Sequence, residues 1–263
     1  MIPGIGICSC KLNGLPRGPW VSNSAMVSGL AKVDFYAHPT VFFIGTDMYL
    51  ISGQGNGGAP VGYKWNGSTW VSNAAIVSGL PSADNDYKVA VFDIGIDTYL
   101  ITGQGIGVFY GFKWNGSGWV SNSTIVSGLT DVGEKSEPSV FRIGSDLYLL
   151  SATQYSSSYY GWKWNGSGWS VDATIKSGLA GVSWGSCYST VFWIGSDLFL
   201  IRGSGNGYHV GWKWNGSGWD SNSTIVSGLA KINTYVSPAV FWIGTALYLI
   251  VGDFNGNFYG FKY

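Results

Sequence analysis

This chain has few charged residues and few cysteines. Only 11% of its 263 residues are charged, and fourteen basic residues balance fourteen acidic ones. A chain without net charge has no overall field that would attract a polyanion, so nucleic acid and anionic membrane surfaces are not expected partners. The three cysteines, Cys8, Cys10 and Cys187, allow one intramolecular bridge at most, which excludes a disulfide framework.

Long hydrophobic runs, an export signal and a metal-ligand cluster are also missing. The longest apolar runs, such as that from Leu247 to Val251, are far shorter than the roughly 20 residues of a membrane helix. No charged segment leads into an apolar stretch at the N-terminus. We therefore expect a soluble protein without a membrane span, either cytoplasmic or exported by a non-classical route. The two histidines lie in different repeats, so we predict ordinary buried thiols, no metal site and no cofactor.

Glycine, aromatic residues and repetition are abundant instead. The chain has 41 glycines, and 16% of its residues are aromatic. A segment of about fifty residues occurs five times, and its tryptophan recurs at Trp20, Trp70, Trp119, Trp169 and Trp219. Self-similarity at this period is typical of propellers and solenoids. One periodicity along the whole chain favours a single domain over residues 1–263.

Each repeat contains four strand-like segments. They are P-A-V-F-W-I-G, L-Y-L-I-S-G, F-Y-G-F-K-W and G-W-V-S-N-S-T-I-V, and N-G between the last two favours a hairpin. The second segment is apolar on both faces, so it must be covered on both sides. No segment has a sustained 3.6-residue period with caps, so we expect essentially no helix. The sequence predicts an all-β, five-bladed β-propeller of four-stranded antiparallel blades.

The two ends of the chain predict how the ring closes. We expect the N-terminal segment 7–30 to complete the blade that begins at about residue 236 and runs to residue 263. Trp20 would then open the fourth strand of that blade. Closure from both termini removes an exposed sheet edge. A surplus strand-like segment near Cys8 has no assigned place.

The two faces of the predicted disc differ in sequence. The turns after the first and third strands, I-G-[ST]-D and N-G-S-G, are short and nearly invariant. Their aspartates are interpreted as turn residues, with Ala246 as the exception, at Asp47, Asp97, Asp146 and Asp197. The loops after the second and fourth strands are longer and differ between repeats. Divergent loops on a rigid frame commonly carry recognition, and an equally good explanation is that nothing constrains them.

Large rings next to polar side chains occur in and beside these variable loops. Aromatic faces suit the C–H faces of sugars, and amides, hydroxyls and carboxylates suit their hydroxyls. The same residue types also suit a protein interface. We predict that Trp184 and Tyr188 form the best single stacking platform. The predicted ligand-binding residues are Phe35, Tyr36, Gln54, Tyr87, Gln104, Trp184, Tyr188 and Tyr235.

Catalytic motifs are poorly represented. A glycosidase needs a pair of carboxylates, and among the V-F-x-I-G segments of the innermost strands only Asp93 supplies an acid. The residue at this position varies through Phe43, Asp93, Arg142, Trp193 and Trp242, so its surroundings must differ around the ring. No G-x-S-x-G segment or phosphate-binding loop is present. We therefore predict that the chain is not an enzyme.

The consensus order P-A-V-F-W-I-G-S-D-L-Y-L-I, a glycine-rich loop and F-Y-G-F-K-W-N-G-S-G-W resembles the blade motif of the PLL-type bacterial lectins. In that motif a short strand, an R-G-T-D-like turn, an L-Y-x-K-W strand and W-D-G-x-x-W follow in the same sequence. The five-blade count is similar to that of the tachylectin-type lectins. The resemblance covers about residues 7 to 263. It implies monosaccharide sites in clefts between adjacent blades, up to five of them, although the loops that would line them differ between copies.

Together these features predict a non-enzymatic, multivalent carbohydrate-binding protein. Its expected partners are glycans, and its expected sites lie between blades on the face that carries the variable loops. The alternative is a structural or self-assembling protein-interaction propeller without a sugar ligand.

Overall fold

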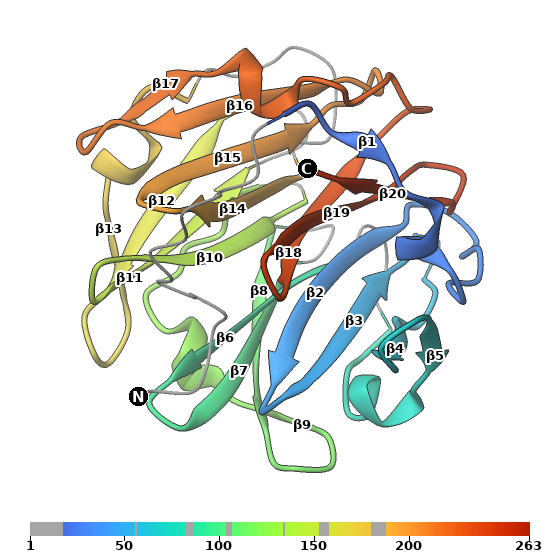
Figure 1. The fold of residues 1–263 in the computed structure, drawn as a ribbon. Helices are drawn as coiled ribbons and strands as arrows, with labels where there is room; N and C mark the ends of the chain where they lie inside the picture. The colour runs from blue at the N-terminus through green and yellow to red at the C-terminus, as the bar shows by residue number, and fades with distance from the viewer. Residues whose placement is uncertain are drawn as a thin grey trace.

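The computed structural model describes residues 18–55, 57–82, 87–103, 107–133, 135–152, 158–179 and 188–263. In these residues twenty strands form five four-stranded antiparallel sheets around a central axis (Figure 1). The predicted five-bladed propeller is therefore confirmed. Within the described ranges there is no α-helix, and no helix has the length and apolar character that crossing a bilayer requires.

Four blades are built from consecutive strands that run from the axis to the rim. Blade 1 comprises β2 (His38–Ile44), β3 (Asp47–Gly53), β4 (Val61–Trp65) and β5 (Trp70–Ser72). Blade 2 comprises β6 (Lys88–Ile94), β7 (Asp97–Gly103), β8 (Phe109–Trp114) and β9 (Trp119–Ser121). Blade 3 comprises β10 (Glu137–Ile143), β11 (Asp146–Ala152), β12 (Tyr159–Trp164) and β13 (Trp169–Val171). Blade 4 comprises β14 (Ser189–Ile194), β15 (Asp197–Gly203), β16 (His209–Trp214) and β17 (Trp219–Ser221).

Blade 5 joins the two ends of the chain. It comprises β18 (Ser237–Ile243), β19 (Ala246–Gly252), β20 (Phe258–Lys262) and the N-terminal β1 (Val21–Ser22). Val21 pairs with Lys262 and Ser22 with Phe261, so the predicted closure from both termini is confirmed. The surplus segment near Cys8, like all three cysteines, lies outside the described residues.

The fourth segment of each repeat is only partly a strand. After two or three extended residues the chain turns into a short 3-10 helix, which corrects the expectation that the whole fourth segment is a strand. In η3 the Asn122 side chain accepts a hydrogen bond from the Ile125 amide at 3.2 Å, and such local bonds compete with a sheet ladder. The five helices are η1 (Ser24–Val27), η2 (Ala74–Val77), η3 (Ser123–Val126), η4 (Thr174–Lys176) and η5 (Ser223–Val226).

A repeated tryptophan fastens each blade to the one before it. The Trp169 indole Nε1 donates to the Ile125 carbonyl oxygen of blade 2 at 2.7 Å, and both side chains are buried. The same bond closes the ring where Trp20 donates to the Ile225 carbonyl oxygen at 2.7 Å. We call these five bonds the rim latches; the remaining three are donated by Trp70, Trp119 and Trp219.

The I-G turns at one end of the axis carry a repeated ion pair. In blade 2 the Lys113 Nζ lies 2.7 Å from an Asp97 carboxylate oxygen. The equivalent bonds from Lys64 and Lys163 lower the pKa of Asp47 and Asp146. The lysine and aspartate side chains are about two-fifths exposed, so each pair contributes little stability. Blade 5 lacks the pair because Ala246 replaces the aspartate opposite Lys262.

Candidate functional site

Three of the predicted rings meet on the variable-loop face, where blade 5 adjoins blade 1. Phe35 and Tyr36 precede β2, and Tyr235 precedes β18. Their ring centroids lie 5.6, 4.8 and 5.7 Å from that of Phe254, in the loop after β19. Phe35 is 39% exposed and the other three rings are half-buried. We call these four rings the aromatic cluster. The sequence analysis did not single out Phe254, although its loop belongs to the variable set.

Backbone hydrogen bonds hold the loops of this cluster together. The Phe254 amide donates to the Thr234 carbonyl oxygen and the Tyr36 amide to the Phe254 carbonyl oxygen, both at 2.9 Å. The predicted Gln54 lies beside them, because its Oε1 accepts from the Asp34 amide at 3.4 Å and its Nε2 donates to a backbone oxygen. Phe35, Tyr36, Gln54 and Tyr235 are therefore brought together by the fold.

Two residues of the aromatic cluster have a strained backbone. Tyr36 and Tyr235 have φ angles of 53° and 54°, in the left-handed region that bulky residues rarely adopt. Lys135, at the equivalent place before β10, has φ 57°, and its Nζ lies 5.4 Å from the Tyr36 ring centroid. Strain of about 1–3 kcal/mol per residue persists where surrounding structure enforces it, and it clusters at functional sites.

Beneath the aromatic cluster, one equivalent position at the start of the inner strands, or directly before β14, carries five different side chains. His38, Lys88, Glu137, Tyr188 and Ser237 are at most 4% exposed. The Lys88 Nζ donates to the Ser189 carbonyl oxygen at 2.7 Å, and the His38 and Tyr188 ring centroids lie 4.1 Å apart. Burial lowers the pKa of Lys88 to about 8, while the Glu137 charge opposes that shift. The sequence analysis singled out only Tyr188 of this layer, although the residue at this position differs in every repeat.

Two further predicted residues, Tyr87 and Tyr188, do not offer ring faces. Tyr87 and Tyr188 are both 0% exposed, because the segments before β6 and β14 turn into the core. The carbonyl of Tyr87, for example, packs directly on Gly53 of blade 1. Gln104 and Trp184 lie outside the described residues, and with them half of the predicted Trp184–Tyr188 platform. Among the described residues, no three His, Cys, Asp or Glu side chains group as metal ligands would.

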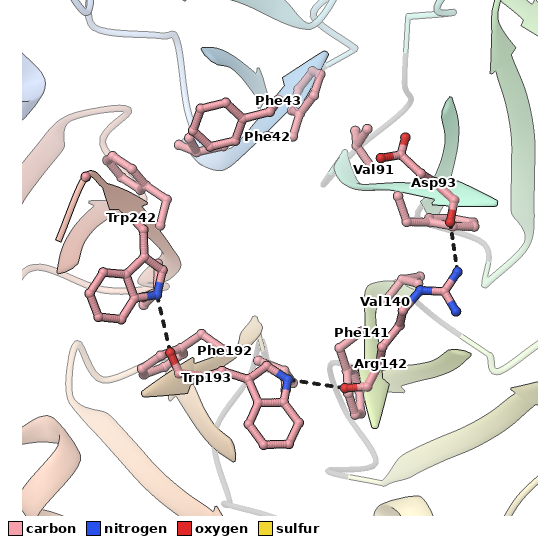
Figure 2. A pocket seen from close by; sticks show the side chains of 16 residues that line it. Phe42, Phe43, Val91, Asp93, Val140, Phe141, Arg142, Phe192, Trp193 and Trp242 are labelled. Carbon is pink, nitrogen blue, oxygen red and sulfur yellow. Dashed lines mark hydrogen bonds between the residues drawn. The ribbon is translucent and has the colours of Figure 1, made fainter. Parts of the chain in front are cut away.

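The opposite end of the axis, next to the I-G turns, contains a cavity of about 330 Å³. The inner strands of all five blades line it (Figure 2). Phe43, Asp93, Arg142, Trp193 and Trp242 occupy equivalent positions and are half-buried there. We call this space the axial cavity.

Comparisons with known proteins show the fold. No protein-family model matches this chain, and no curated protein matches it. Among solved structures, the SapL1 lectin in complex with alpha-methyl fucoside is 15% identical, with a TM-score of 0.52 over 89% of this chain and 82% of the lectin. An alpha-L-arabinofuranosidase of Podospora anserina, in complex with cellotriose, is 11% identical, with a TM-score of 0.65 over 94% and 98%. A GH43 beta-xylosidase/alpha-arabinofuranosidase from a compost microbial metagenome is 11% identical, with a TM-score of 0.62 over 91% and 94%.

The likeness to lectin propellers is thus confirmed for the fold, whereas the prediction that the chain is not an enzyme is contradicted. Solved structures with this fold include xylosidases and arabinofuranosidases as well as lectins, so the fold does not separate the two classes. Because β10 begins at Glu137, the innermost strands also carry an acid outside the V-F-x-I-G segments, in addition to Asp93 within them.

Proposed function

We propose that this chain is a carbohydrate-binding propeller with a site on the variable-loop face, between blades 5 and 1. The observation that carries the proposal is the convergence of Phe35, Tyr36 and Tyr235 on Phe254. Partly exposed rings of this kind pack against the C–H faces of a sugar. Sugar-bound proteins among the structural neighbours support glycans as the partner class.

The aromatic cluster can orient a sugar as well as stack on it. The exposed Asp34 carboxylate lies in the same loop, and the Lys135 ammonium lies over the Tyr36 ring. A carboxylate accepts hydrogen bonds from sugar hydroxyls, and an ammonium donates them. Sites at other blade junctions would be lined by different residues, so we propose unequal sites. Simultaneous engagement of several sites raises avidity by roughly 10² to 10⁴.

A glycan array with the purified chain, repeated with excess free monosaccharide, tests the proposal. We expect a selective signal that the free sugar competes away. Because enzymes share the fold, the bound glycans are also analysed for released sugars. A blank array from folded protein, at concentrations that suffice for weak multivalent binding, would overturn the proposal.

Variants then locate the site. Asparagine tolerates the left-handed backbone, so Tyr36→Asn and Tyr235→Asn remove the rings with little backbone change. We expect each to reduce the array signal by about tenfold or more, the effect of losing one well-packed contact of about 1.4 kcal/mol. Tyr208→Asn is the matched control, because Tyr208 is 53% exposed in a turn of blade 4 outside the cluster. Undiminished glycan binding by both Tyr36→Asn and Tyr235→Asn would show that the sugar does not bind at the aromatic cluster.

A self-assembling module is the second candidate. Valines on the outermost strands face solvent at the rim: Val21, Val71, Val120 and Val171 are 48–74% exposed. Exposed edge strands that carry apolar side chains favour association between sheets. Such a protein would show a mass that rises with concentration and does not respond to sugar, as sedimentation would measure.

A further inference from the structure

We propose that the axial cavity is a second binding site, on the face opposite the aromatic cluster, and that its ligand is a single neutral sugar ring. This inference is independent of the site between blades 5 and 1. Its basis is the arrangement of the five residues that differ at one otherwise repeated position: Phe43, Asp93, Arg142, Trp193 and Trp242.

The wall of the axial cavity is divided into an aromatic arc and a polar arc. Trp193, Trp242 and Phe43 come from the adjacent blades 4, 5 and 1, and Asp93 and Arg142 come from blades 2 and 3 (Figure 2). At this varying position the three aromatic side chains therefore lie together on one side of the cavity, with the two charged residues across from them, while a repeated phenylalanine of every blade also contributes to the wall. A ligand that fits must have one apolar face and a polar edge.

Hydrogen bonds between blades fix these side chains before any ligand arrives. The Trp193 Nε1 donates to the Arg142 carbonyl oxygen at 3.2 Å, and the Trp242 Nε1 donates to the Trp193 carbonyl oxygen at 3.3 Å. Two Arg142 nitrogens donate to the carbonyl oxygens of Ser145 and Asp93 at 2.9 and 3.0 Å. Because the indole N–H groups are satisfied within the frame, the ring faces remain for contact. Preorganisation of this kind lowers the entropy that binding must overcome.

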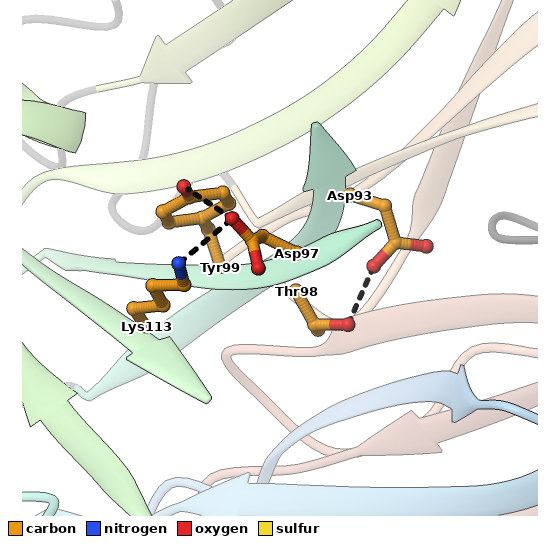
Figure 3. A network of polar contacts seen from close by, with 5 residues as sticks. All are labelled: Asp93, Asp97, Thr98, Tyr99 and Lys113. Atoms are coloured by element: carbon orange, nitrogen blue, oxygen red, sulfur yellow. Dashed lines mark hydrogen bonds and ion pairs between the residues drawn. The ribbon is translucent and has the colours of Figure 1, made fainter. Parts of the chain in front are cut away.

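Asp93 has a polar partner that the other blades lack. The Thr98 hydroxyl donates to the Asp93 Oδ1 at 2.7 Å across the β6–β7 pair (Figure 3). At the equivalent position the other blades carry the apolar Met48, Leu147, Leu198 and Leu247. The second carboxylate oxygen of Asp93 has no hydrogen bond to any described residue. Blade 2 therefore supplies both Asp93 and the hydroxyl that orients it, and the second Asp93 oxygen remains available as an acceptor.

The charges of the axial cavity favour a neutral ligand. One carboxylate and one guanidinium face the same small space, so a cationic ligand would meet Arg142 and an anionic ligand would meet Asp93. A sugar ring avoids both repulsions. Its hydroxyls donate to the carboxylate and accept from the unused guanidinium N–H groups, while its C–H face packs on the indoles. For a ligand of about a dozen non-hydrogen atoms with these contacts, we expect a dissociation constant on the order of 1 mM.

Saturation-transfer NMR on the full chain tests this site, with methyl alpha-fucoside, xylose, arabinose and glucose as the probes. We expect at least one probe to bind wild type. Trp242→Leu removes one ring face and is expected to abolish the signal that remains in a Tyr36→Asn background, where the aromatic cluster no longer contributes. Asp93→Asn keeps the shape and the Thr98 bond but loses the charge, and is expected to weaken binding about tenfold.

Two control variants separate this site from its surroundings. Asp97→Asn changes a carboxylate of the same blade that pairs with Lys113 outside the cavity, so it is expected to bind like wild type. Tyr36→Asn changes only the aromatic cluster, so it is expected to lose the contribution of that cluster and to leave the contribution of the axial cavity unchanged. Folding of each variant is checked by its melting temperature. If Trp242→Leu does not fold, Asp93→Asn alone tests the axial cavity. Absence of binding for all four probes, or wild-type affinity in folded Asp93→Asn, would overturn the proposal.

Discussion

The rim and the axis of this propeller differ in how strictly their residues repeat from blade to blade. At the rim the same tryptophan makes the same hydrogen bond in all five blades, with N–O distances of 2.7–2.9 Å. At the axis one position of the inner strand carries Phe43, Asp93, Arg142, Trp193 and Trp242 in turn. Residues that hold one blade to the next repeat because each junction has the same geometry. The residue at this one axial position does not have to make the same contact in every blade, and there the blades differ.

Loss of a rim latch is expected to have the largest effect on stability. Trp169→Ala removes a side chain that is 3% exposed and its bond to the Ile125 carbonyl. We expect a loss of about 3–5 kcal/mol in the free energy of unfolding, as for other buried tryptophans. Trp119→Ala should lose a similar amount, because its junction is the same. Urea unfolding measures both losses. A twofold difference between them would contradict the claim that the rim latches are equivalent.

The second effect depends on pH and concerns His209 on β16. Both ring nitrogens are buried without a hydrogen bond to a described residue, and burial lowers the pKa of His209 to about 4. The unfolded chain therefore binds the proton more readily, and stability is lost as pH falls from about 6.5 towards 4. The loss at pH 4 is on the order of 3 kcal/mol.

The repeat itself supplies the variant that tests this effect. Equivalent positions in blades 2 and 5 are Phe109 and Phe258, so His209→Phe restores an apolar residue of the frame. Melting temperatures measured between pH 7 and pH 4 should fall less steeply for this variant. Identical slopes for the variant and wild type would show that His209 does not titrate in this way.

A smaller effect is expected for Asp93, which faces the axial cavity. Burial raises the pKa of this carboxyl more than Thr98 and Arg142 lower it. The folded protein then holds the proton to higher pH than the unfolded chain, so the charged form is less stable and wild type loses stability as pH rises through that window. Asp93→Asn lacks this loss. At pH 7 we expect its free energy of unfolding to be equal to that of wild type within about 0.5 kcal/mol, or higher. A clearly lower free energy of unfolding for Asp93→Asn would show that Asp93 stabilises the fold, contrary to this expectation.

The smallest effect is expected from completing the repeat in blade 5. Ala246→Asp places a carboxylate opposite Lys262, as Asp97 lies opposite Lys113. An exposed ion pair of this kind should raise the melting temperature slightly, and 1 M salt should remove the gain. A gain that persists in salt would need another cause.

Much of the fold was predictable because the five copies reinforce one another. Strand number, the ring closure through Trp20 and the two unequal faces follow from patterns that repeat along the chain. The 3-10 helices were missed because S-T-I-V also suits a strand, and the Asn122 side-chain bond decides the outcome locally.

The candidate site was predictable only in part. Phe35, Tyr36 and Tyr235 meet because blades 1 and 5 adjoin, which the ring closure implies. Tyr87 and Tyr188 lie in similar sequence surroundings, yet they are buried by contacts with distant segments that no local pattern encodes. The role of Thr98 as a hydrogen-bond donor to Asp93 could be recognised only from the β6–β7 register, which places the two residues opposite each other.

The most direct test of this account is a crystal structure of the chain soaked with the monosaccharide that competes best on the array. The account predicts bound sugar where the blades differ, beside Tyr36 and Tyr235 and in the axial cavity against Trp193 and Trp242. Sugar bound at five equivalent places built from repeated residues, with both of these sites empty, would contradict it.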